Sequence, residues 1–464
     1  MNRLVALLLL WTLASCKTPT EDPTALAITN VTVIDAVHGR RDAQTVVFRD
    51  DHIVAVQPTS GAPPNASRII DGTGRYLIPG LWDFHVHLTY TDELTAAMPE
   101  LFLRYGITSV RDTGGTLGKL LPVVEGMRAA DARAPRVFFS GPLLDGTRVV
   151  YDGVGRELLG TAIGSTDDAR KTVAALKRAG ADFIKIYELV SPEVFQALVD
   201  AARDLGMPIE SHVPLVMLAR DAGPMVDGIQ HLRNIELDCA ADAEALLEER
   251  RRFAEREKTM SGFDLRSAVR EKQILPAIAN YDPQRCEETM AALRGTLQGP
   301  TLRLNAYGLS PPYTRPDWES ALSLVPEPLQ SQWREFGERQ LANPRERDLR
   351  GAHFSLFLTG EMFRRGVPFA AGTDTPIGFA VPGYSLHREL ELLVESGLTP
   401  LQALGAATLE PAKFFGLEQE MGSITVDQKA DLVLLTADPQ VSIGNTKQIA
   451  MVIAKGRVVF EAEP

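Results

Sequence analysis

Two histidines one residue apart, His85 and His87, are the first residues of this chain whose types and spacing could do chemistry. They end the stretch YLIPGLWDFHVH, whose apolar run predicts a strand buried on both faces. Residues i and i+2 of a strand face the same side, so both imidazoles project together. Adjacent imidazoles form half of a metal site, with Asp83 or a backbone carbonyl holding their tautomers. The alternative is a pair of histidines satisfied within the core.

Four further residues of this kind lie in or end short apolar runs. Lys185 lies in DFIKIY, and His212, His231 and Asp374 close the runs PIESH, GIQH and PFAAGTD. Imidazole and carboxylate groups are common ligands of zinc. A lysine that stays cationic in an apolar strand is costly, because burial penalises the charged form. The pattern therefore predicts a metal-binding cluster if the strands that carry these residues are neighbours.

The middle of the chain alternates short apolar strands with helical stretches. This alternation is typical of βα units on a parallel sheet. The candidate strands are Trp82 to His87, Thr108 to Asp112, Arg136 to Gly141, Phe183 to Tyr187, Pro208 to His212, Ile229 to Leu232, Leu302 to Tyr307 and Pro368 to Asp374. Eight strands suit a (β/α)8 TIM barrel, an α/β fold whose active sites lie at the carboxyl ends of the strands. The candidate metal ligands fall at these ends.

The spacing of the strands predicts one large insertion. Lys185, His212 and His231 follow one another at spacings of roughly one βα unit, whereas far more chain separates His231 from Asp374. We therefore expect an insertion at about 236–350. It includes the charged stretch ADAEALLEERRRFAEREK, which predicts a solvated amphipathic helix rather than a partner-binding segment.

Both ends of the chain have the alternating pattern of short antiparallel strands. Apolar and polar residues alternate over residues 25–76, and a similar alternation occurs over residues 418–464. Neither end alone holds enough strands for a stable sheet. We therefore expect both ends to meet in one small β-sandwich, flanking a barrel formed by residues 77–417.

The segment 1–16, MNRLVALLLLWTLASC, predicts an exported protein. A basic start, a short apolar core and small residues before Cys16 are typical of a signal peptide, and the apolar run is too short to span a membrane. The small residues before the cysteine resemble the lipobox of bacterial lipoproteins, which implies a lipid on Cys16 and a tether over 17–24. A lysine rather than an aspartate after the cysteine, here Lys17, resembles the pattern of lipoproteins forwarded to the outer membrane. We therefore expect the protein to be anchored in the outer membrane, facing the periplasm. An ordinary secretory signal is the alternative.

Composition limits the partners of this protein. The chain has 464 residues and a net charge of −12, which argues against nucleic-acid binding. Three cysteines cannot form a disulfide framework. If Cys16 carries lipid, Cys239 and Cys286 remain, and an exported location would permit them to pair. We expect a small-molecule substrate, and the oligomeric state stays open.

Together these motifs resemble the amidohydrolase superfamily over nearly the whole mature chain. Further similar pieces are IDGTGRYLIPGLWDFHVH, SLHRELELLVESGLTPLQALGAATLEPAKFFGL and GSITVDQKADLVLL. The branch that looks most similar is the imidazolonepropionase-related, prolidase-like metal-dependent hydrolases. The resemblance implies two divalent metal ions, usually zinc. It assigns His85, His87 and Asp374 to one ion and assigns His212 and His231 to the other.

The resemblance also implies that Lys185 is carboxylated by CO2 and bridges both ions. The alternative is a lysine that snorkels or pairs with a carboxylate. Two adjacent metal ions lower the pKa of a bridging water and polarise a substrate carbonyl. Asp374 is placed to take the proton from that water and to deliver it to the leaving group.

We therefore expect a metal-dependent hydrolase that cleaves a C–N amide of the dipeptide or N-acyl amino acid type. A cyclic amide such as an imidazolone, a lactone or a phosphotriester stays open as the substrate, because the same metal pair serves them all. A surface binding lipoprotein on a disabled scaffold is the alternative from another class. The presence of all six metal-site residues counts against it.

Other polar residues are weaker candidates for the site. His387 matches a family position that implies orientation of Asp374 or its loop, and packing is the alternative. Arg148, Tyr187 and Arg233 lie near strand ends and could bind a substrate carboxylate. The third-strand loop, SGPLLDGTRVVYDGVG, lacks the histidine-bearing glycine-rich loop of some dipeptidase members, and this departs from the prolidase pattern.

Overall fold

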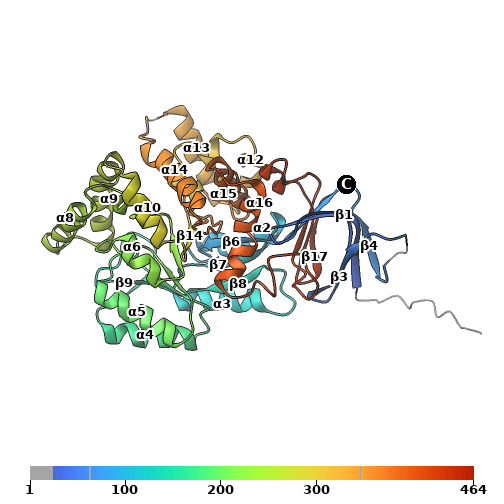
Figure 1. Cartoon of the computed structure of the whole chain (residues 1–464), viewed down its shortest axis with the longest axis horizontal. Helices are drawn as coiled ribbons and strands as arrows, with labels where there is room; N and C mark the ends of the chain where they lie inside the picture. Colours follow the sequence, from blue (N-terminus) through green and yellow to red (C-terminus); the bar gives the residue numbers. More distant parts are fainter. Residues whose placement is uncertain (1–24, 62–63, 345, 464) are drawn as a thin grey trace, which may run out of the picture.

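A computed structural model describes residues 25–61, 64–344 and 346–463 of the chain. The predicted signal peptide over 1–16, the tether over 17–24 and the lipidation residue Cys16 lie outside the described residues. A barrel with surrounding helices forms the larger part, and a β-sheet from both chain ends flanks it on one side (Figure 1). Within the described ranges, every helix is too short or too polar to cross a membrane.

Short strands that pair in parallel, most of them buried, form the barrel wall. The strands are β6 (Leu81–Val86), β7 (Ile107–Asp112), β8 (Arg136–Phe139), β9 (Leu143–Asp145), β10 (Gly160–Ala162), β11 (Ile184–Ile186), β12 (Ile209–Ser211), β13 (Gly228–Gln230) and β14 (Leu297–Gly299). One sheet has the order β6-β7-β8, and a second has the order β10-β9-β11-β12-β13-β14. The third strand of the barrel is thus divided, with β8 beside β7 and β9 beside β11.

The segment 368–374 closes the ring between β14 and β6. Phe369 bridges Gln298 of β14, and Thr375 bridges Val86 of β6, both in parallel. The N–H of Phe84 donates to the carbonyl of Ala371 at 3.0 Å. These contacts are consistent with the predicted (β/α)8 barrel.

The seventh strand is not where the sequence predicted it. The segment Leu302–Asn305 is helix α11. The seventh strand is instead β14, which ends three residues before Leu302. The stretch LRLN alternates like a strand, but the Glu389 carboxylate accepts hydrogen bonds from the backbone N–H groups of Leu302 (2.8 Å) and Arg303 (2.7 Å). This carboxylate satisfies the free N–H groups of a helix start, as an N-cap residue does.

Helices cover the outside of the barrel. They are α1 (Asp92–Thr95), α2 (Met98–Arg104), α3 (Leu117–Arg128), α4 (Thr166–Arg178), α5 (Pro192–Asp204), α6 (Ala219–Ala222), η1 (Gly223–Met225), α15 (Tyr384–Glu395), α16 (Pro400–Ala406) and α17 (Leu409–Phe414). In α4 the buried residues Ala169, Val173 and Leu176 recur with helical spacing, and the Ser165 side chain accepts the N–H of Asp168 at the N-terminus. Each such helix has one apolar face on the sheet and one polar face toward water.

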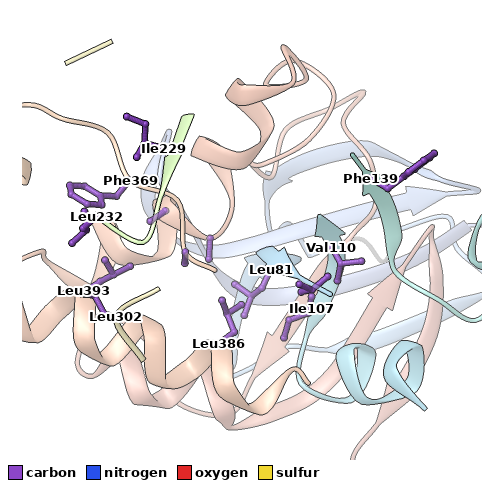
Figure 2. Close-up of a cluster of buried hydrophobic side chains, with 14 of the residues drawn as sticks. Leu81, Ile107, Val110, Phe139, Ile229, Leu232, Leu302, Phe369, Leu386 and Leu393 are labelled. Atoms are coloured by element: carbon purple, nitrogen blue, oxygen red, sulfur yellow. The ribbon is translucent and has the colours of Figure 1, made fainter. Parts of the chain in front are cut away.

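The main hydrophobic core lies between the barrel strands and these helices. Figure 2 shows part of it, with side chains from strands β6, β7, β8 and β13 and from helices α11 and α15. The labelled residues are Leu81, Ile107, Val110, Phe139, Ile229, Leu232, Leu302, Phe369, Leu386 and Leu393. Burial of these side chains against the helices holds the barrel strands in place.

The two chain ends meet in one sheet beside the barrel. Its strands are β1 (Ala25–Asp35), β2 (Gly39–Arg49), β3 (His52–Pro58), β4 (Arg68–Asp71), β5 (Tyr76–Pro79), β15 (Leu432–Leu435), β16 (Ile449–Ala454) and β17 (Arg457–Glu461), with η3 (Ile443–Lys447) before β16. The order is β17-β16-β15-β5-β1-β2-β3, with β4 also beside β1. Side chains of β1, β2, β15 and β16 share one hydrophobic core. The strands therefore form one continuous hydrogen-bonded sheet, in which both chain ends enclose a common core.

The predicted single insertion at 236–350 is divided in two by β14. The first part follows β13 and the second follows β14. The helices are α7 (Ile235–Asp238), α8 (Ala243–Arg256), α9 (Gly262–Ala279) and α10 (Pro283–Ala292) in the first part, and α11 (Leu302–Asn305), η2 (Pro312–Thr314), α12 (Trp318–Leu322), α13 (Leu329–Ala342) and α14 (Arg350–Arg364) in the second. A disulfide between Cys239 and Cys286 joins the end of α7 to α10.

Candidate metal centre

All six predicted metal-site residues line one small cavity at the carboxyl ends of the barrel strands. The cavity has a volume of about 20 Å³. Its lining includes His85, His87, Lys185, His212, His231 and Asp374, together with Tyr187 and Arg233. Lys185 lies on β11 and His85 on β6, whereas the other histidines directly follow their strands. The parallel barrel therefore brings together residues that are far apart in the sequence.

His85, His87 and Asp374 form the tightest group in this cavity. Asp374 Oδ1 lies 3.2 Å from Nε2 of His85 and 3.1 Å from Nε2 of His87. One ligand atom from each of the three residues lies within 4.8 Å of the others, close enough to bind a single metal ion. The imidazole ring of His231 is 4.7 Å from that of His85 and 4.9 Å from that of His212, measured between centroids. The second pair of histidines thus adjoins the first group.

Hydrogen bonds at Nδ1 fix the tautomers of the first two histidines. Nδ1 of His85 lies 2.7 Å from the side-chain carbonyl of Gln230, and Nδ1 of His87 lies 3.0 Å from the backbone carbonyl of Gly114. A carbonyl oxygen only accepts, so each Nδ1 must carry the proton. Each Nε2 therefore presents a lone pair to the cavity. Asp83, the other predicted partner, instead accepts hydrogen bonds from the N–H and hydroxyl of Thr373.

The other two histidines are held in the same way. Nδ1 of His212 donates to Oε1 of Glu188 at 2.8 Å. Nδ1 of His231 lies 2.6 Å from the hydroxyl of Thr301, which itself donates to the carbonyl of Pro300 at 2.8 Å. The Thr301 hydroxyl proton is used in that bond, so the oxygen accepts from His231. All four histidines thus present Nε2 lone pairs.

This arrangement fits a divalent metal ion. The lone pairs of His85 and His87 point at Asp374 Oδ1, which is itself an acceptor, and that oxygen has no hydrogen-bond donor among the described residues. Electron pairs this close repel one another unless a cation or a proton lies between them. Metal-bound histidines characteristically donate their other N–H to a carboxylate, a carbonyl or another acceptor, as these four do.

Burial keeps three of the four histidines neutral. Burial lowers the pKa of His85 to about 4 and the pKa values of His212 and His231 well below the ordinary value. Burial also opposes a charge on His87, but the neighbouring Asp374 carboxylate raises the pKa of His87 above its ordinary value. Burial alone would raise the pKa of Asp374, but the neighbouring His85 and His231 hold that pKa well below its usual range. Neutral imidazoles and an ionised carboxylate are the forms that bind a metal ion.

Lys185 is a buried amine without a hydrogen bond. Its side chain is 1% exposed, and Nζ has no hydrogen-bond partner in the described part of the chain. Burial lowers the pKa of Lys185 to about 7, so a large fraction of the amine is neutral near neutral pH. Buried polar groups are nearly always paired, so an unpaired amine beside four histidines indicates a missing ligand or modification.

A larger cleft adjoins the metal cavity. It has a volume of about 620 Å³, and His231 and Arg233 line both spaces. Side chains of α9 and α14, from both parts of the insertion, form much of its wall. The cleft gives a small molecule room next to the candidate metal ligands.

Several weaker predictions have different outcomes. His387 does not contact Asp374: its Nδ1 bonds the hydroxyl of Thr446 at 2.8 Å and its Nε2 bonds the carbonyl of Tyr105 at 3.1 Å. The packing alternative therefore holds for His387. Arg148 is used for structure, donating to two backbone carbonyls of helix α8 and the residue after it. Tyr187 and Arg233, by contrast, line the metal cavity.

The partners of the histidines were missed by sequence reasoning. Gln230, Glu188 and Thr301 are single polar residues without a spacing pattern. Gln230 immediately precedes His231, and Glu188 lies three residues after Lys185. This proximity to predicted ligands is the signal that could have singled them out. Thr301 gave no such signal, because it is 70 residues from His231.

Residues 359–459 match the family model described as the amidohydrolase family. An adenine deaminase from Roseobacter denitrificans is 41% identical over 88 residues, which are 19% of this chain and 14% of that protein. Imidazolonepropionase from Symbiobacterium thermophilum is 25% identical over 432 residues, 89% of each chain. The crystal structure of a Xaa-Pro dipeptidase with methionine bound in its active site is similar with a TM-score of 0.67 and 18% identity, covering 95% of this chain and all of that one. The last two matches extend over nearly the whole described chain.

Proposed function

We propose that this chain, whose residues 359–459 match the amidohydrolase family model, is a metal-dependent hydrolase cleaving a C–N amide of the dipeptide or N-acyl amino acid type. One observation carries the proposal. Four histidines, a carboxylate and a buried lysine without a hydrogen bond meet in one cavity beside a cleft of about 620 Å³. Such a concave site with perturbed titratable groups is where a substrate is expected to react.

We assign the site to two divalent ions, with zinc as the expected metal. His85, His87 and Asp374 would hold one ion, and His212 and His231 would hold the other. Bound there, the metal pair would supply an activated water and polarise the scissile carbonyl. The Nδ1 hydrogen bonds of all four histidines support this assignment, because they orient the rings toward the cavity.

A carboxylated Lys185 would complete the site as a bridge between both ions. In this reaction the neutral amine attacks CO2 and loses a proton, so the product is an anionic carbamate with two ligand oxygens. The unpaired Nζ and the lowered pKa of Lys185 support the modification, since the neutral amine is the reacting form. It also replaces a buried cation by an anion next to two metal ions.

Asp374 would transfer the proton during hydrolysis. Its carboxylate has the low pKa of an ionised group and faces the cavity, so it could accept a proton from water and return it to the nitrogen of the leaving group. An amine leaves poorly unless it is protonated. This requirement favours an amide substrate for a site with one such carboxylate.

A cyclic amide is the second candidate substrate. The likeness to an imidazolonepropionase over 89% of both chains favours it. Lactones and phosphotriesters suit the same metal pair but need the returned proton less.

The test is a substrate panel with matched variants. The protein is purified with zinc and bicarbonate and is assayed against dipeptides, N-acyl amino acids, cyclic amides, lactones and phosphotriesters. We expect turnover of an amide and about two metal ions per chain, both reduced in Lys185→Ala. One ion per chain with unmodified Lys185 would contradict the bridge, and high kcat/KM only on lactones or phosphotriesters would contradict the amide assignment.

We further propose that the protein is a lipoprotein anchored through Cys16. The resemblance of its first residues to a lipobox supports this, and a lipid chain contributes about 0.8 kcal/mol per buried CH2 to membrane binding. Cys16→Ser should move the protein from the membrane fraction to the soluble fraction. Retention of the variant in the membrane pellet would count against the lipid anchor.

A further inference from the structure

Arg233 occupies the border between the metal cavity and the larger cleft. Together with His231 it lines both spaces, and its side chain is 13% exposed. The guanidinium of Arg233 therefore lies where the cleft and the metal cavity adjoin. An arginine side chain carries its positive charge at any physiological pH.

The guanidinium has unused hydrogen-bond donors. Nε and Nη1 of Arg233 are buried and have no partner among the residues that the structure describes. The carboxylate of Glu188 is near, but its Oε1 lies 4.0 Å from Nη1, which is beyond hydrogen-bond distance. That oxygen already accepts the bond from His212. Leaving a buried charged donor unpaired is costly, so these donors indicate an absent acceptor.

The backbone around Arg233 is held in an unusual conformation. The φ angles of His231, Leu232 and Asn234 are +65°, +55° and +64°, in the left-handed region that is unfavourable for residues other than glycine. The Asn234 side chain secures this turn, donating to the carbonyl of Val213 at 2.8 Å and accepting from Arg250 at 2.9 Å. Strained turns persist only where the surroundings hold them, and they concentrate at functional sites.

Arg148 shows what a structural arginine looks like in this chain. Its two terminal nitrogens donate to the carbonyls of Glu257 and Ala254 at 2.8 and 3.2 Å. It therefore has backbone acceptors where Arg233 has none in the described residues. The comparison separates an arginine that holds two segments together from one that lines two cavities and has donors without a hydrogen bond.

We propose that Arg233 binds the carboxylate of the substrate, so that the enzyme prefers amides of amino acids with a free carboxylate. The proposal rests on the proposed function. A planar guanidinium binds a carboxylate through two parallel hydrogen bonds, which fixes orientation as well as charge. The carboxylate would lie at the border of the two spaces, with the scissile bond toward the metal ligands. The apolar side chains of Ile274, Ile278 and Leu358 in the cleft would then accept an apolar side chain of the substrate.

Binding of L-leucine and L-phenylalanine to the zinc-loaded protein tests the proposal without any turnover. Each amino acid is compared by calorimetry with its amino alcohol, leucinol or phenylalaninol, which replaces the carboxylate by a hydroxymethyl group. We expect at least one acid to bind tenfold or more tighter than its alcohol. Arg233→Gln should abolish this preference, whereas Arg148→Gln, the matched control, should keep it.

Arg233→Lys keeps the charge but loses the planar pair of donors. It should lower the preference without abolishing it, and it serves as the test if Arg233→Gln does not fold. A preference that survives in Arg233→Gln, an unchanged preference in Arg233→Lys, or no preference in the wild type would each overturn the proposal. A clear preference together with no hydrolysis of any amide would leave the carboxylate site standing and reject only the proposed function.

Discussion

Arg111 Nη1 donates to Glu210 Oε2 at 2.6 Å, and both side chains are fully buried beneath the candidate metal centre. The guanidinium of Arg111 also lies 3.4 Å from the centroid of the Phe84 ring. Glu210 pairs in register with Lys185 on the neighbouring strand. This buried ion pair therefore helps to hold together the strands that carry the metal-site residues.

Arg111→Met should destabilise the protein by about 3–5 kcal/mol, because it leaves Glu210 as an uncompensated buried charge. Urea unfolding gives the change in free energy. Lys119→Met is the control, since Lys119 forms an exposed ion pair with Asp92 that should contribute about 1 kcal/mol or less. The double variant with Glu210→Gln should recover part of the loss. Equal effects of the two single variants would contradict the prediction.

Asp374→Asn should lower amide turnover by roughly 10²–10⁴-fold, because a side-chain amide cannot accept and return a proton. Much of the metal should remain through the other five ligands. The measurements are kcat and metal content of the same preparation. Residual hydrolysis of esters with good leaving groups should fall by a smaller factor, and an equal fall on amides and esters would argue against a proton-transfer role.

Thr301→Val should weaken metal binding by roughly 10–100-fold, because it removes the acceptor that orients His231. Competition with a fluorescent chelator measures the affinity. Thr408→Val is the matched control, since its hydroxyl donates to the carbonyl of Leu404 away from the metal cavity. If both variants bind metal alike, Thr301 does not position the ligand.

Removal of metal should lower the melting temperature, since a ligand that binds only the folded protein stabilises it by about 2.7 kcal/mol at 100 times its Kd. Scanning calorimetry before and after chelation, and after zinc is returned, measures the shift. His85→Ala should respond less than the wild type because it lacks one ligand. An identical melting temperature with and without zinc would mean that the ion does not bind the native site.

Cys239→Ala combined with Cys286→Ala should cost about 4 kcal/mol in a loop-entropy account, given the separation of 47 residues between the two cysteines. Urea unfolding under oxidising conditions provides the value. Adding reductant should destabilise the wild type but leave the double variant unchanged. If reductant does not change the stability of the wild type, packing alone holds α7 against α10.

The candidate ligands were predictable because strand periodicity and barrel topology are simple rules. His85 and His87 share a face by their spacing, and parallel strands bring His212, His231 and Asp374 to one end. The resemblance of the motifs strengthened the same assignment. The hydrogen-bond partner Thr301 was out of reach, because its contact with His231 depends on how the chain turns after β14.

The seventh strand shows where local patterns mislead. The stretch after Pro300 alternates apolar and polar residues, but Glu389, far along the chain, accepts its first N–H groups and makes it a helix. A long-range carboxylate thus decided between two local conformations. Because the strand was misplaced, the insertion also appeared as one piece when β14 in fact divides it.

The pairing of β5 with β15 makes the support of the site depend on a strand that is synthesised late. Leu77 of β5 pairs with Leu434 of β15, a strand that is synthesised long after β5. Until then one edge of β5 has no partner, and exposed strand edges invite aggregation. Gly80 joins β5 directly to β6, the strand that carries His85. A nascent or truncated chain that lacks β15 therefore lacks the support behind its first metal ligands, and chaperone dependence should be greatest before β15 has been synthesised.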